Sequence, residues 1–200
     1  RKGVDYFIAI ATQFIHSYSI DNAYFVWFGE SDDNYSSFFY FIKRDLIRNK
    51  ISHRFIFAGA QDDVEPFFVG SDIFLLTSRE DPFPCVVHEA MAAGLPIIVF
   101  DGNGGATEAL GKAGITVPFG NISRTAEVIL KLFLNLEYRH RLGKMAKKRV
   151  QAKYSFQKYC LLLTKLIQEE MGIDLYLDTT TLDQETAVKG INPSHKERLK

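Results

Sequence analysis

Residues 78–99 read SREDPFPCVVHEAMAAGLPIIV, and this stretch is the most informative part of the chain. Asp81 and Glu89 have seven residues between them, and a turn followed by a helix separates the two carboxylates. The predicted helix covers residues 85–93 and ends at Gly94, a residue that commonly closes helices. Such a segment can direct one acid at a polyhydroxylated ligand, the other at a second pair of hydroxyl groups, and a helix N-terminus at an anion. A nucleotide-sugar offers that set of groups.

Helical and extended patterns alternate on both sides of this stretch. Apolar residues recur at helical spacing within residues 3–18, and residues 23–28 form an apolar run typical of a buried strand. Strands are predicted at residues 23–28, 53–58, 73–76, 96–100 and 115–117. Helices are predicted at residues 3–18, 36–49, 64–69, 85–93, 107–110, 122–135, 137–153 and 155–171. Residues 172–200 are polar and aperiodic and are predicted to form a poorly structured tail, although residues 173–177 could add a short strand.

The predicted strands are apolar throughout and alternate with helices, which is typical of an α/β fold with a doubly wound parallel sheet covered on both faces. Ligands of such sheets bind beyond the carboxyl ends of the strands. The loops that follow the predicted strands, residues 29–30, 59–61, 77–84 and 101–105, contain the chemically interesting side chains. The sequence therefore predicts a binding site at this edge of the sheet.

The bulk properties narrow the class of protein. With 46% hydrophobic and 24% charged residues the chain is typical of a globular domain with a sizeable core. The formal net charge is zero, so no nucleic-acid partner is expected. Cys85 and Cys160 fall in apolar helical contexts, which favours reduced thiols in a cytoplasmic setting and a small buried residue at Cys85. No apolar run is long enough to span a bilayer.

Several motifs occur in the order seen in glycosyltransferase group 1 proteins: the Arg1-Lys2-Gly3 start, the Gly59 loop, and residues 71–78, 81–99 and 104–108. Over residues 1–171 the chain resembles the C-terminal, donor-binding domain of these retaining enzymes, which have the two-domain GT-B architecture. The resemblance implies a Rossmann-like sheet, a nucleotide-sugar partner and an acceptor domain that precedes Arg1. Family members place the first strand just before the Arg-Lys-Gly motif. We therefore expect this strand to be missing here, with lowered stability or an oligomer as the consequence.

The resemblance also implies roles for individual residues. The family pattern is Glu, seven residues, Glu, and Asp81 stands at its first position, which keeps the charge and shortens the reach by one methylene. Asp81 would contact the hydroxyl groups of the donor sugar, and Glu89 would accept hydrogen bonds from the ribose; these two are the candidate catalytic residues. Lys2 would neutralise the donor diphosphate, with Arg1 as a further candidate for that role.

The residue types themselves support an anion site. Backbone N–H groups and the dipole at the start of the helix at 85–93 favour a diphosphate, and a Lys ammonium adds a point charge. The backbone in question belongs to Phe83, Pro84, Cys85 and Val86. A nucleoside pocket, assigned by position together with Glu89, would be lined by Gly59, Ala60 and Gln61. No dense cluster of Asp, Glu and His is evident, so we expect no metal and no cofactor, with the nucleoside diphosphate sugar as donor substrate.

Each of these features also has a plainer interpretation. Asp81 before Pro82 can simply cap a turn. Glu89 can belong to a solvated helix face, and Gly104-Gly105 can be only a turn. The basic residues between 139 and 149 are typical of a solvated helix face, although they leave peripheral contact with a membrane open.

We therefore predict the donor-binding half of a retaining glycosyltransferase. It would move a hexosyl unit from a nucleoside diphosphate sugar to a saccharide or lipid-linked acceptor, in the cytoplasm or at a membrane surface. This chain alone is expected to bind the donor weakly and to transfer nothing. The alternative is a non-catalytic nucleotide-sugar-binding or interaction module, which the replacement of the family's Glu by Asp81 favours.

Overall fold

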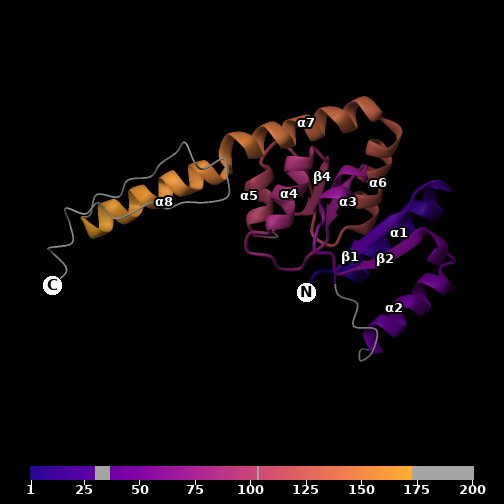
Figure 1. The fold of residues 1–200 in the computed structure, drawn as a ribbon. Helices are drawn as coiled ribbons and strands as arrows, with labels where there is room; N and C mark the ends of the chain where they lie inside the picture. The colour runs from indigo at the N-terminus through magenta and orange to yellow at the C-terminus, as the bar shows by residue number, and fades with distance from the viewer. Residues whose placement is uncertain (30–36, 103, 173–200) are drawn as a thin grey trace. The chain divides into compact units, whose positions relative to one another are not determined.

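The computed structural model describes residues 1–29, 37–102 and 104–172 (Figure 1). The chain divides into two compact units, residues 1–150 and residues 151–200, and each is described by itself. The strands are β1 (Phe25–Phe28), β2 (Phe55–Gly59), β3 (Phe74–Leu76), β4 (Ile97–Phe100) and β5 (Ile115–Val117). The helices are α1 (Val4–Tyr18), α2 (Ser37–Arg48), α3 (Glu65–Val69), α4 (Cys85–Ala93), α5 (Gly105–Leu110), α6 (Ile122–Leu134), α7 (Leu136–Lys153) and α8 (Phe156–Met171). The predicted α/β class is confirmed.

The strands form two parallel sheets. In the first, β1 pairs with β2 and Phe25 lies opposite Phe55. In the second, β4 lies between β3 and β5, and Ile98 lies opposite both Leu75 and Ile115. Within the described residues β1 and β3 are not paired with each other, so the predicted sheet is present as a two-stranded and a three-stranded part.

Strand β4 is covered on both faces. All of its residues, Ile97–Phe100, are fully buried, and successive side chains of a strand point to opposite faces. Ile98 and Phe100 join a hydrophobic core that also contains residues of α1 and α6. Helices α4 and α5 also contact β4, and Figure 1 shows β4 between α4 and α6. This layering explains why the strand is apolar without alternation.

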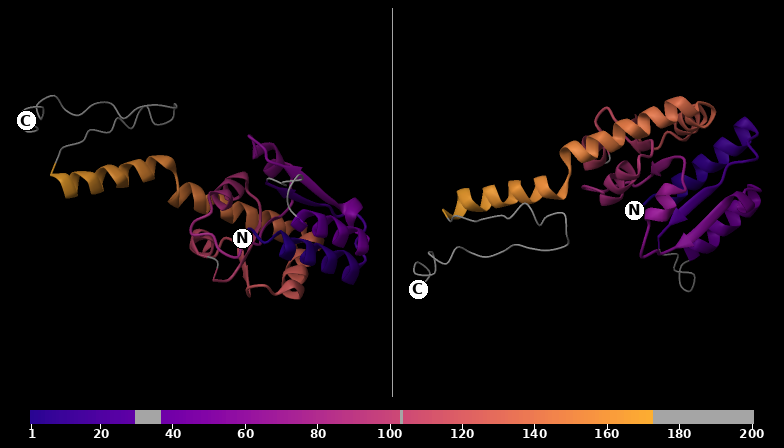
Figure 2. Two further views of the ribbon diagram at one scale, coloured as in Figure 1. Left: turned by 90° about the horizontal axis from the view of Figure 1, so that it is seen from below. Right: turned by 45° about the horizontal axis from the view of Figure 1, so that its top comes forward.

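Helix α1 packs against strands of both sheets (Figure 2). The ring of Phe7 lies 5.7 Å from those of Phe25 and Phe55, whereas the ring of Tyr6 lies 5.5 Å from that of Phe100. These pairs are edge-to-face, the arrangement that the quadrupoles of aromatic rings favour. The aromatic face of α1 therefore joins two sheets that share no strand pairing in the described part of the chain.

Most predicted helices and strands agree with the structure to within two residues at each end. Helix α4 ends at Gly94, whose φ of 81° is left-handed, as expected for a C-terminal glycine. One boundary was wrong: residues His53 and Arg54 belong to a 3-10 turn, Ser52–Arg54, rather than to the following strand. The short strand proposed at residues 173–177, and all of the predicted tail after Gly172, lie outside the described residues.

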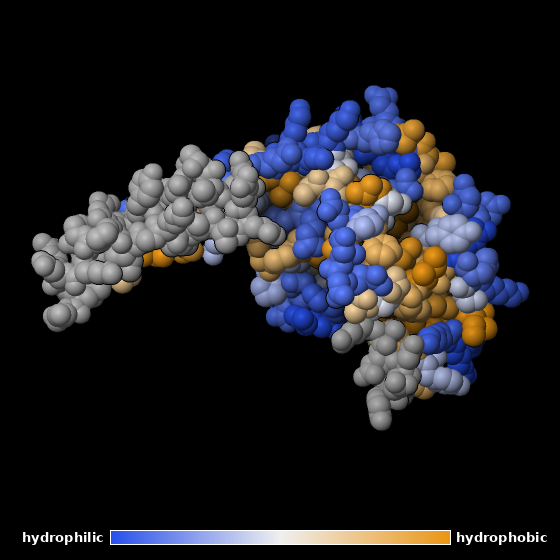
Figure 3. All heavy atoms as spheres, viewed as in Figure 1, coloured by the Kyte–Doolittle hydropathy of each residue, from blue (hydrophilic) through white to orange (hydrophobic). Residues whose placement is uncertain are grey.

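The basic residues of α7 are only in part a solvated face. Figure 3 shows hydrophilic side chains along α7, and His140, Arg141 and Lys144 are exposed. Arg139, in contrast, pairs with Asp72 at 3.0 Å, and Arg149 donates to backbone carbonyls of α5. Two of the charges thus anchor α7 to its neighbours. In the described part of the chain, no helix combines the length and the apolar character needed to cross a membrane.

The first prediction concerns the core around α1. Phe14 is 1% exposed and its ring contacts those of Phe25 and Phe133 at 5.9 and 5.8 Å. Phe14→Ala should lower the free energy of unfolding by about 3–5 kcal/mol, because it removes buried apolar surface and leaves a cavity. Urea denaturation followed by circular dichroism measures this loss. Leu134→Ala, at a position that is 71% exposed, is the matched control and should change stability by less than about 0.5 kcal/mol. Equal losses would contradict the assigned core.

Candidate functional site

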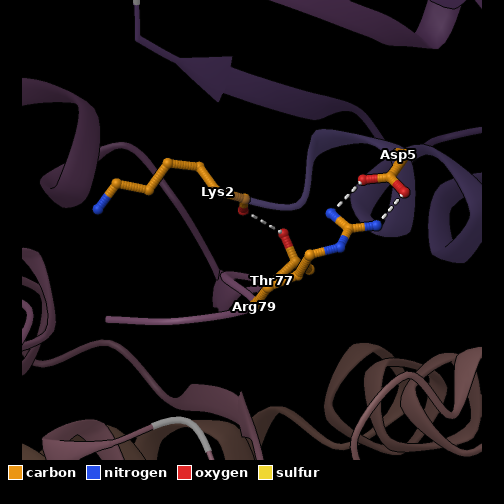
Figure 4. Close-up of polar contacts among 4 residues, drawn as sticks. All are labelled: Lys2, Asp5, Thr77 and Arg79. Carbon is orange, nitrogen blue, oxygen red and sulfur yellow. Dashed lines mark hydrogen bonds and ion pairs between the residues drawn. The ribbon is translucent and has the colours of Figure 1, made fainter. Parts of the chain in front are cut away.

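Residues 1–5 and residues 77–81 lie directly against each other where β3 ends and α1 begins. The backbone N–H of Arg79 donates to the carbonyl of Arg1 at 2.9 Å. The hydroxyl of Thr77 donates to the carbonyl of Lys2 at 3.3 Å, as Figure 4 shows. Gly3 has a φ of 76°, and a Cβ atom there would lie 1.9 Å from the carbonyl oxygen of Thr77. Only glycine fits this approach. We call this contact between residues 1–5 and 77–81 the α1–β3 seam.

The seam brings together two of the residues predicted from the sequence. Lys2 Nζ donates to Asp81 Oδ2 at 2.6 Å, although 79 positions separate the two residues. The Asp81 side chain is only 10% exposed, whereas that of Lys2 is 54% exposed. A carboxylate that is buried to this extent needs a partner, and the ammonium supplies it. The pair therefore places a cation and an acid side by side at the carboxyl end of β3.

The turn that carries Asp81 is also held from the side of α5. The backbone N–H of Gly105 donates to the carbonyl of Pro82 at 2.7 Å. A Cβ atom at Gly104 would lie 2.5 Å from the carbonyl oxygen of Asp81, and one at Gly105 would lie 2.1 Å from the Phe83 ring. Gly104-Gly105 is thus more than a turn, because its lack of side chains lets α5 begin against the acidic loop.

A second ion pair crosses the seam and was not predicted from the sequence. The guanidinium of Arg79 donates to both carboxylate oxygens of Asp5, at 2.8 and 2.5 Å, and lies 4.4 Å from the centre of the Tyr6 ring. The hydrogen bond from Arg79 lowers the pKa of Asp5 below its ordinary value of 3.8, against an opposing effect of partial burial. The same hydrogen bond raises the pKa of Arg79. Because the two residues are 74 positions apart, no local pattern in the sequence signals this pair.

The start of α4 differs in detail from the prediction. Pro84 is the residue before the helix, with an extended backbone, and Phe83 is 46% exposed in front of it. Cys85 is exposed, so the prediction of a buried cysteine was wrong. Its apolar neighbours in the sequence suggested burial, but as the first residue of α4 it lies at the edge of a loop. Val86 is half-buried.

Glu89 is exposed on α4, and no hydrogen bond or ion pair joins it to Lys2 or Asp81 in the described structure. The loop of Gly59, Ala60 and Gln61 lies instead at the end of the two-stranded sheet. The carbonyl of Gly59 accepts from the N–H of Gly29 at 3.0 Å, and Ala60 and Gln61 are exposed. The roles of Glu89 and of this loop stay predictions.

A cavity of about 260 Å³ extends from the seam to the end of β1. Its lining includes the cations Arg1, Lys2 and Arg79, the carboxylate of Asp5, and aromatic rings such as those of Trp27 and Phe28. Neither Asp81 nor Glu89 is among the described residues that line it. A larger cavity of about 500 Å³ is lined by residues of α1 and α2, by Asn49 and by Ile122. None of the predicted site residues lines it, so we do not place the site there. Among the described residues no group of His, Cys, Asp and Glu is arranged to hold a metal ion.

A parallel α/β fold with charged residues gathered where strands end is typical of the α/β proteins that bind ligands at this edge of the sheet. The family model for glycosyl transferases group 1 matches residues 1–135, and the chain belongs to this family. This confirms the resemblance drawn from the sequence motifs.

Relatives and solved structures agree with that assignment. The chain is 36% identical over 100 residues to spore coat protein SA of Bacillus subtilis, which covers 48% of this chain and 26% of that protein. It is 31% identical over 118 residues to N-acetyl-alpha-D-glucosaminyl L-malate synthase of Bacillus anthracis, and this match covers 56% of this chain and 30% of that protein. The fold is similar to that of a glycosyltransferase from Rickettsia africae, with a TM-score of 0.76 at 19% identity over 85% of this chain and 45% of that one.

Two further structures show which part of the fold is shared. The C-terminal domain of a glycosyl transferase group 1 family protein from Francisella tularensis superposes with a TM-score of 0.69 at 21% identity, over 78% of this chain and 80% of that one. The structure of Anabaena Alr3699/HepE in complex with UDP-glucose superposes with a TM-score of 0.72 at 18% identity, over 86% of this chain and 45% of that one. The chain spans between 26% and 32% of the length of the curated relatives it matches. Its fold is that of a C-terminal GT-B domain.

The second prediction follows from the lowered pKa of Asp5. The ionised carboxylate favours folding above the pKa of the unfolded chain, about 4, and this contribution is lost as the pH falls through the lower folded value. Wild type should therefore exceed Asp5→Asn in stability by about 0.2–1 kcal/mol at pH 7, the range expected for an exposed pair. The difference should shrink on acidification below about pH 4. Urea denaturation at pH 7 and pH 3 measures it, with Arg79→Gln expected to give the same pattern. A difference that is independent of pH would contradict the assignment.

Proposed function

We propose that this chain is the donor-binding half of a retaining glycosyltransferase that moves a hexosyl unit from a nucleoside diphosphate sugar to a saccharide or lipid-linked acceptor. Family membership supports glycosyl transfer in general. In the proposed reaction the bond from the anomeric carbon to the diphosphate oxygen breaks, and the diphosphate keeps the electron pair. A hydroxyl oxygen of the acceptor forms the new bond and releases its proton.

The observation that carries this proposal is the contact of Lys2 with Asp81 at 2.6 Å, at the carboxyl end of β3. A diphosphate leaving group gains negative charge as the sugar departs, and a Lys ammonium stabilises that charge. The carboxylate of Asp81 can accept hydrogen bonds from sugar hydroxyls. On donor binding, the Lys2–Asp81 bond would break. Lys2 would then bind the diphosphate, and Asp81 would accept hydrogen bonds from the sugar. Cation and acid thus start in contact and end on adjacent groups of one ligand.

Other residues would complete the donor site. Backbone N–H groups at the start of α4, those of Phe83, Cys85 and Val86, would bind the diphosphate together with Arg1, whereas Pro84 has no N–H to donate. Glu89 would accept from the ribose hydroxyls, and residues 59–61 would line the base pocket. A neighbour with the same fold, Anabaena Alr3699/HepE, is described in complex with UDP-glucose, which supports a uridine nucleotide as the first donor to test. We propose that the reaction needs no cofactor beyond this donor and takes place in the cytoplasm, against an acceptor domain outside this chain.

A second candidate function is a nucleotide-sugar-binding or interaction module without catalysis. The observation that favours it is the buried state of Asp81, whose side chain is one methylene shorter than the family's Glu and is already bonded to Lys2. Transfer assays on the complete protein separate the two candidates. Donor binding without turnover would favour the module, and sugar transfer would exclude it.

The third prediction tests the proposed donor site. Thermal shifts with UDP, GDP and ADP and their glucose conjugates identify the nucleotide that stabilises the chain. For that nucleotide sugar, Lys2→Met should raise the dissociation constant about tenfold or more, because a hydrogen bond to a charged group is lost. Asp81→Asn should weaken the binding of the nucleotide sugar more than the binding of the free nucleotide, because in the proposed site Asp81 contacts the sugar. Isothermal titration calorimetry measures both effects.

Lys112→Met is the matched control, because Lys112 is exposed after α5 and lies outside the seam. It should leave both affinities unchanged. If Lys2→Met and Asp81→Asn bind every nucleotide of the panel as Lys112→Met does, the proposed donor site is wrong.

A further inference from the structure

Arg79 connects the loop that carries Asp81 to residues 1–6 by contacts of three kinds. Its guanidinium donates to both carboxylate oxygens of Asp5, and its plane lies over the Tyr6 ring at 4.4 Å. Its backbone N–H donates to the carbonyl of Arg1 at 2.9 Å. A bidentate pair with a carboxylate is specific to arginine, because the planar guanidinium presents two parallel N–H groups and a Lys ammonium does not.

In the sequence, Lys2 lies between the two residues to which Arg79 is bonded, Arg1 and Asp5. Helix α1 begins only at Val4, so helical hydrogen bonds do not hold residues 1 and 2. Their backbone carbonyls are held instead by the N–H of Arg79 and the hydroxyl of Thr77. Replacing the Arg79 side chain would remove the link through Asp5 but keep the backbone bond from residue 79 to Arg1. The seam would then depend on that backbone bond, on Gly3, on Thr77 and on the Lys2–Asp81 pair itself.

The Arg79 side chain does not act on Asp81 directly. Figure 4 shows the Lys2 side chain pointing away from the guanidinium of Arg79, which is bonded to Asp5 on the other side. Any influence of the Arg79 side chain on the Lys2–Asp81 pair therefore passes through the backbone, either of residues 1–5, which carry Lys2, or of residues 79–81, which carry Asp81.

We propose that Arg79, bonded to Asp5, is a positioning residue that holds Lys2 against Asp81 and so prepares the pair for the diphosphate of the donor. The link to the donor rests on the proposed function. The placement of Lys2 can be tested without any ligand. The rival interpretation is that Arg79 contacts the diphosphate itself, since it lines the same cavity as Arg1 and Lys2.

The ligand-free test is a double-mutant cycle on Lys2 and Asp81, using Lys2→Met and Asp81→Asn, followed by urea denaturation. The cycle is measured in wild type and again with Arg79→Gln. We expect a favourable coupling between Lys2 and Asp81 in wild type that is lost when Arg79 is replaced. A coupling of equal size in both backgrounds would overturn the proposal, whether or not the chain binds a nucleotide.

The ligand test measures the dissociation constant of UDP-glucose, or of the panel member that stabilises wild type most, by calorimetry. This dissociation constant should rise roughly fivefold in each of three variants, Arg79→Gln, Arg79→Lys and Asp5→Asn. The rise is smaller than the one expected for Lys2→Met, because Lys2 itself is still present. The double variant Asp5→Asn with Arg79→Gln should bind the nucleotide sugar no more weakly than either single variant does, because all three variants break the same Arg79–Asp5 pair.

The two interpretations predict opposite results for two of these variants. If Arg79 binds the phosphates directly, Arg79→Lys keeps much of the affinity and Asp5→Asn increases it, because the guanidinium is released; this result would overturn the proposal. Glu127→Gln is the control, since it breaks the Arg124–Glu127 pair of α6, which is exposed and has a similar length of 2.8 Å. It should change neither the coupling nor the affinity. If wild type binds no nucleotide, the proposed function fails, and the ligand-free cycle alone decides the role of Arg79.

Discussion

The close approach of Gly3 to Thr77 is the constraint on which the first unit depends. A side chain at position 3 would occupy the place of the Thr77 carbonyl, so the helix start and the strand end can meet only because residue 3 is glycine. From this contact α1 runs across both sheets, through Phe7 on one and Tyr6 on the other. The seam therefore sets the position of the helix that joins the sheets and of the loop that carries Asp81.

The opposite side of that loop is held by a second approach of glycine backbone. Gly104 and Gly105 pack against residues 81–83, and the α5 helix that they begin is fixed at its other end by α7. Arg149 donates from Nε to the carbonyl of Ala109 at 2.6 Å and from Nη2 to the carbonyl of Glu108 at 2.8 Å. A cation at a helix C-terminus also interacts favourably with the helix dipole. The acidic turn is thus clamped between the seam and α5, which explains why a short loop can keep a buried carboxylate in one place.

The sequence predicted what depends on local pattern and missed what depends on distant pairing. Helices such as α4 were predicted because apolar spacing and a terminal glycine are local signals. Lys2 and Asp81 were singled out by family motifs rather than by the residues alone, and their direct contact was not predicted. The Arg79–Asp5 pair has neither kind of signal, since an Arg and an Asp 74 positions apart each look like ordinary surface residues. The exposure of Cys85 was missed because apolar neighbours indicate a helix but not which of its residues meets the loop.

The Lys2–Asp81 pair has an energetic consequence for any ligand that binds there. A buried carboxylate without a partner is costly, so Lys2 stabilises the ligand-free protein at the same time as it occupies the acid. An incoming anion that removes Lys2 from Asp81 leaves the buried carboxylate without a partner, which costs free energy. This cost is avoided if another part of the same ligand donates hydrogen bonds to the carboxylate. A free diphosphate has no such donor at neutral pH, whereas a diphosphate sugar carries hydroxyl groups beside the phosphates. The pair therefore favours a ligand that presents an anion and hydroxyl donors together, and it does so before any residue contacts the base.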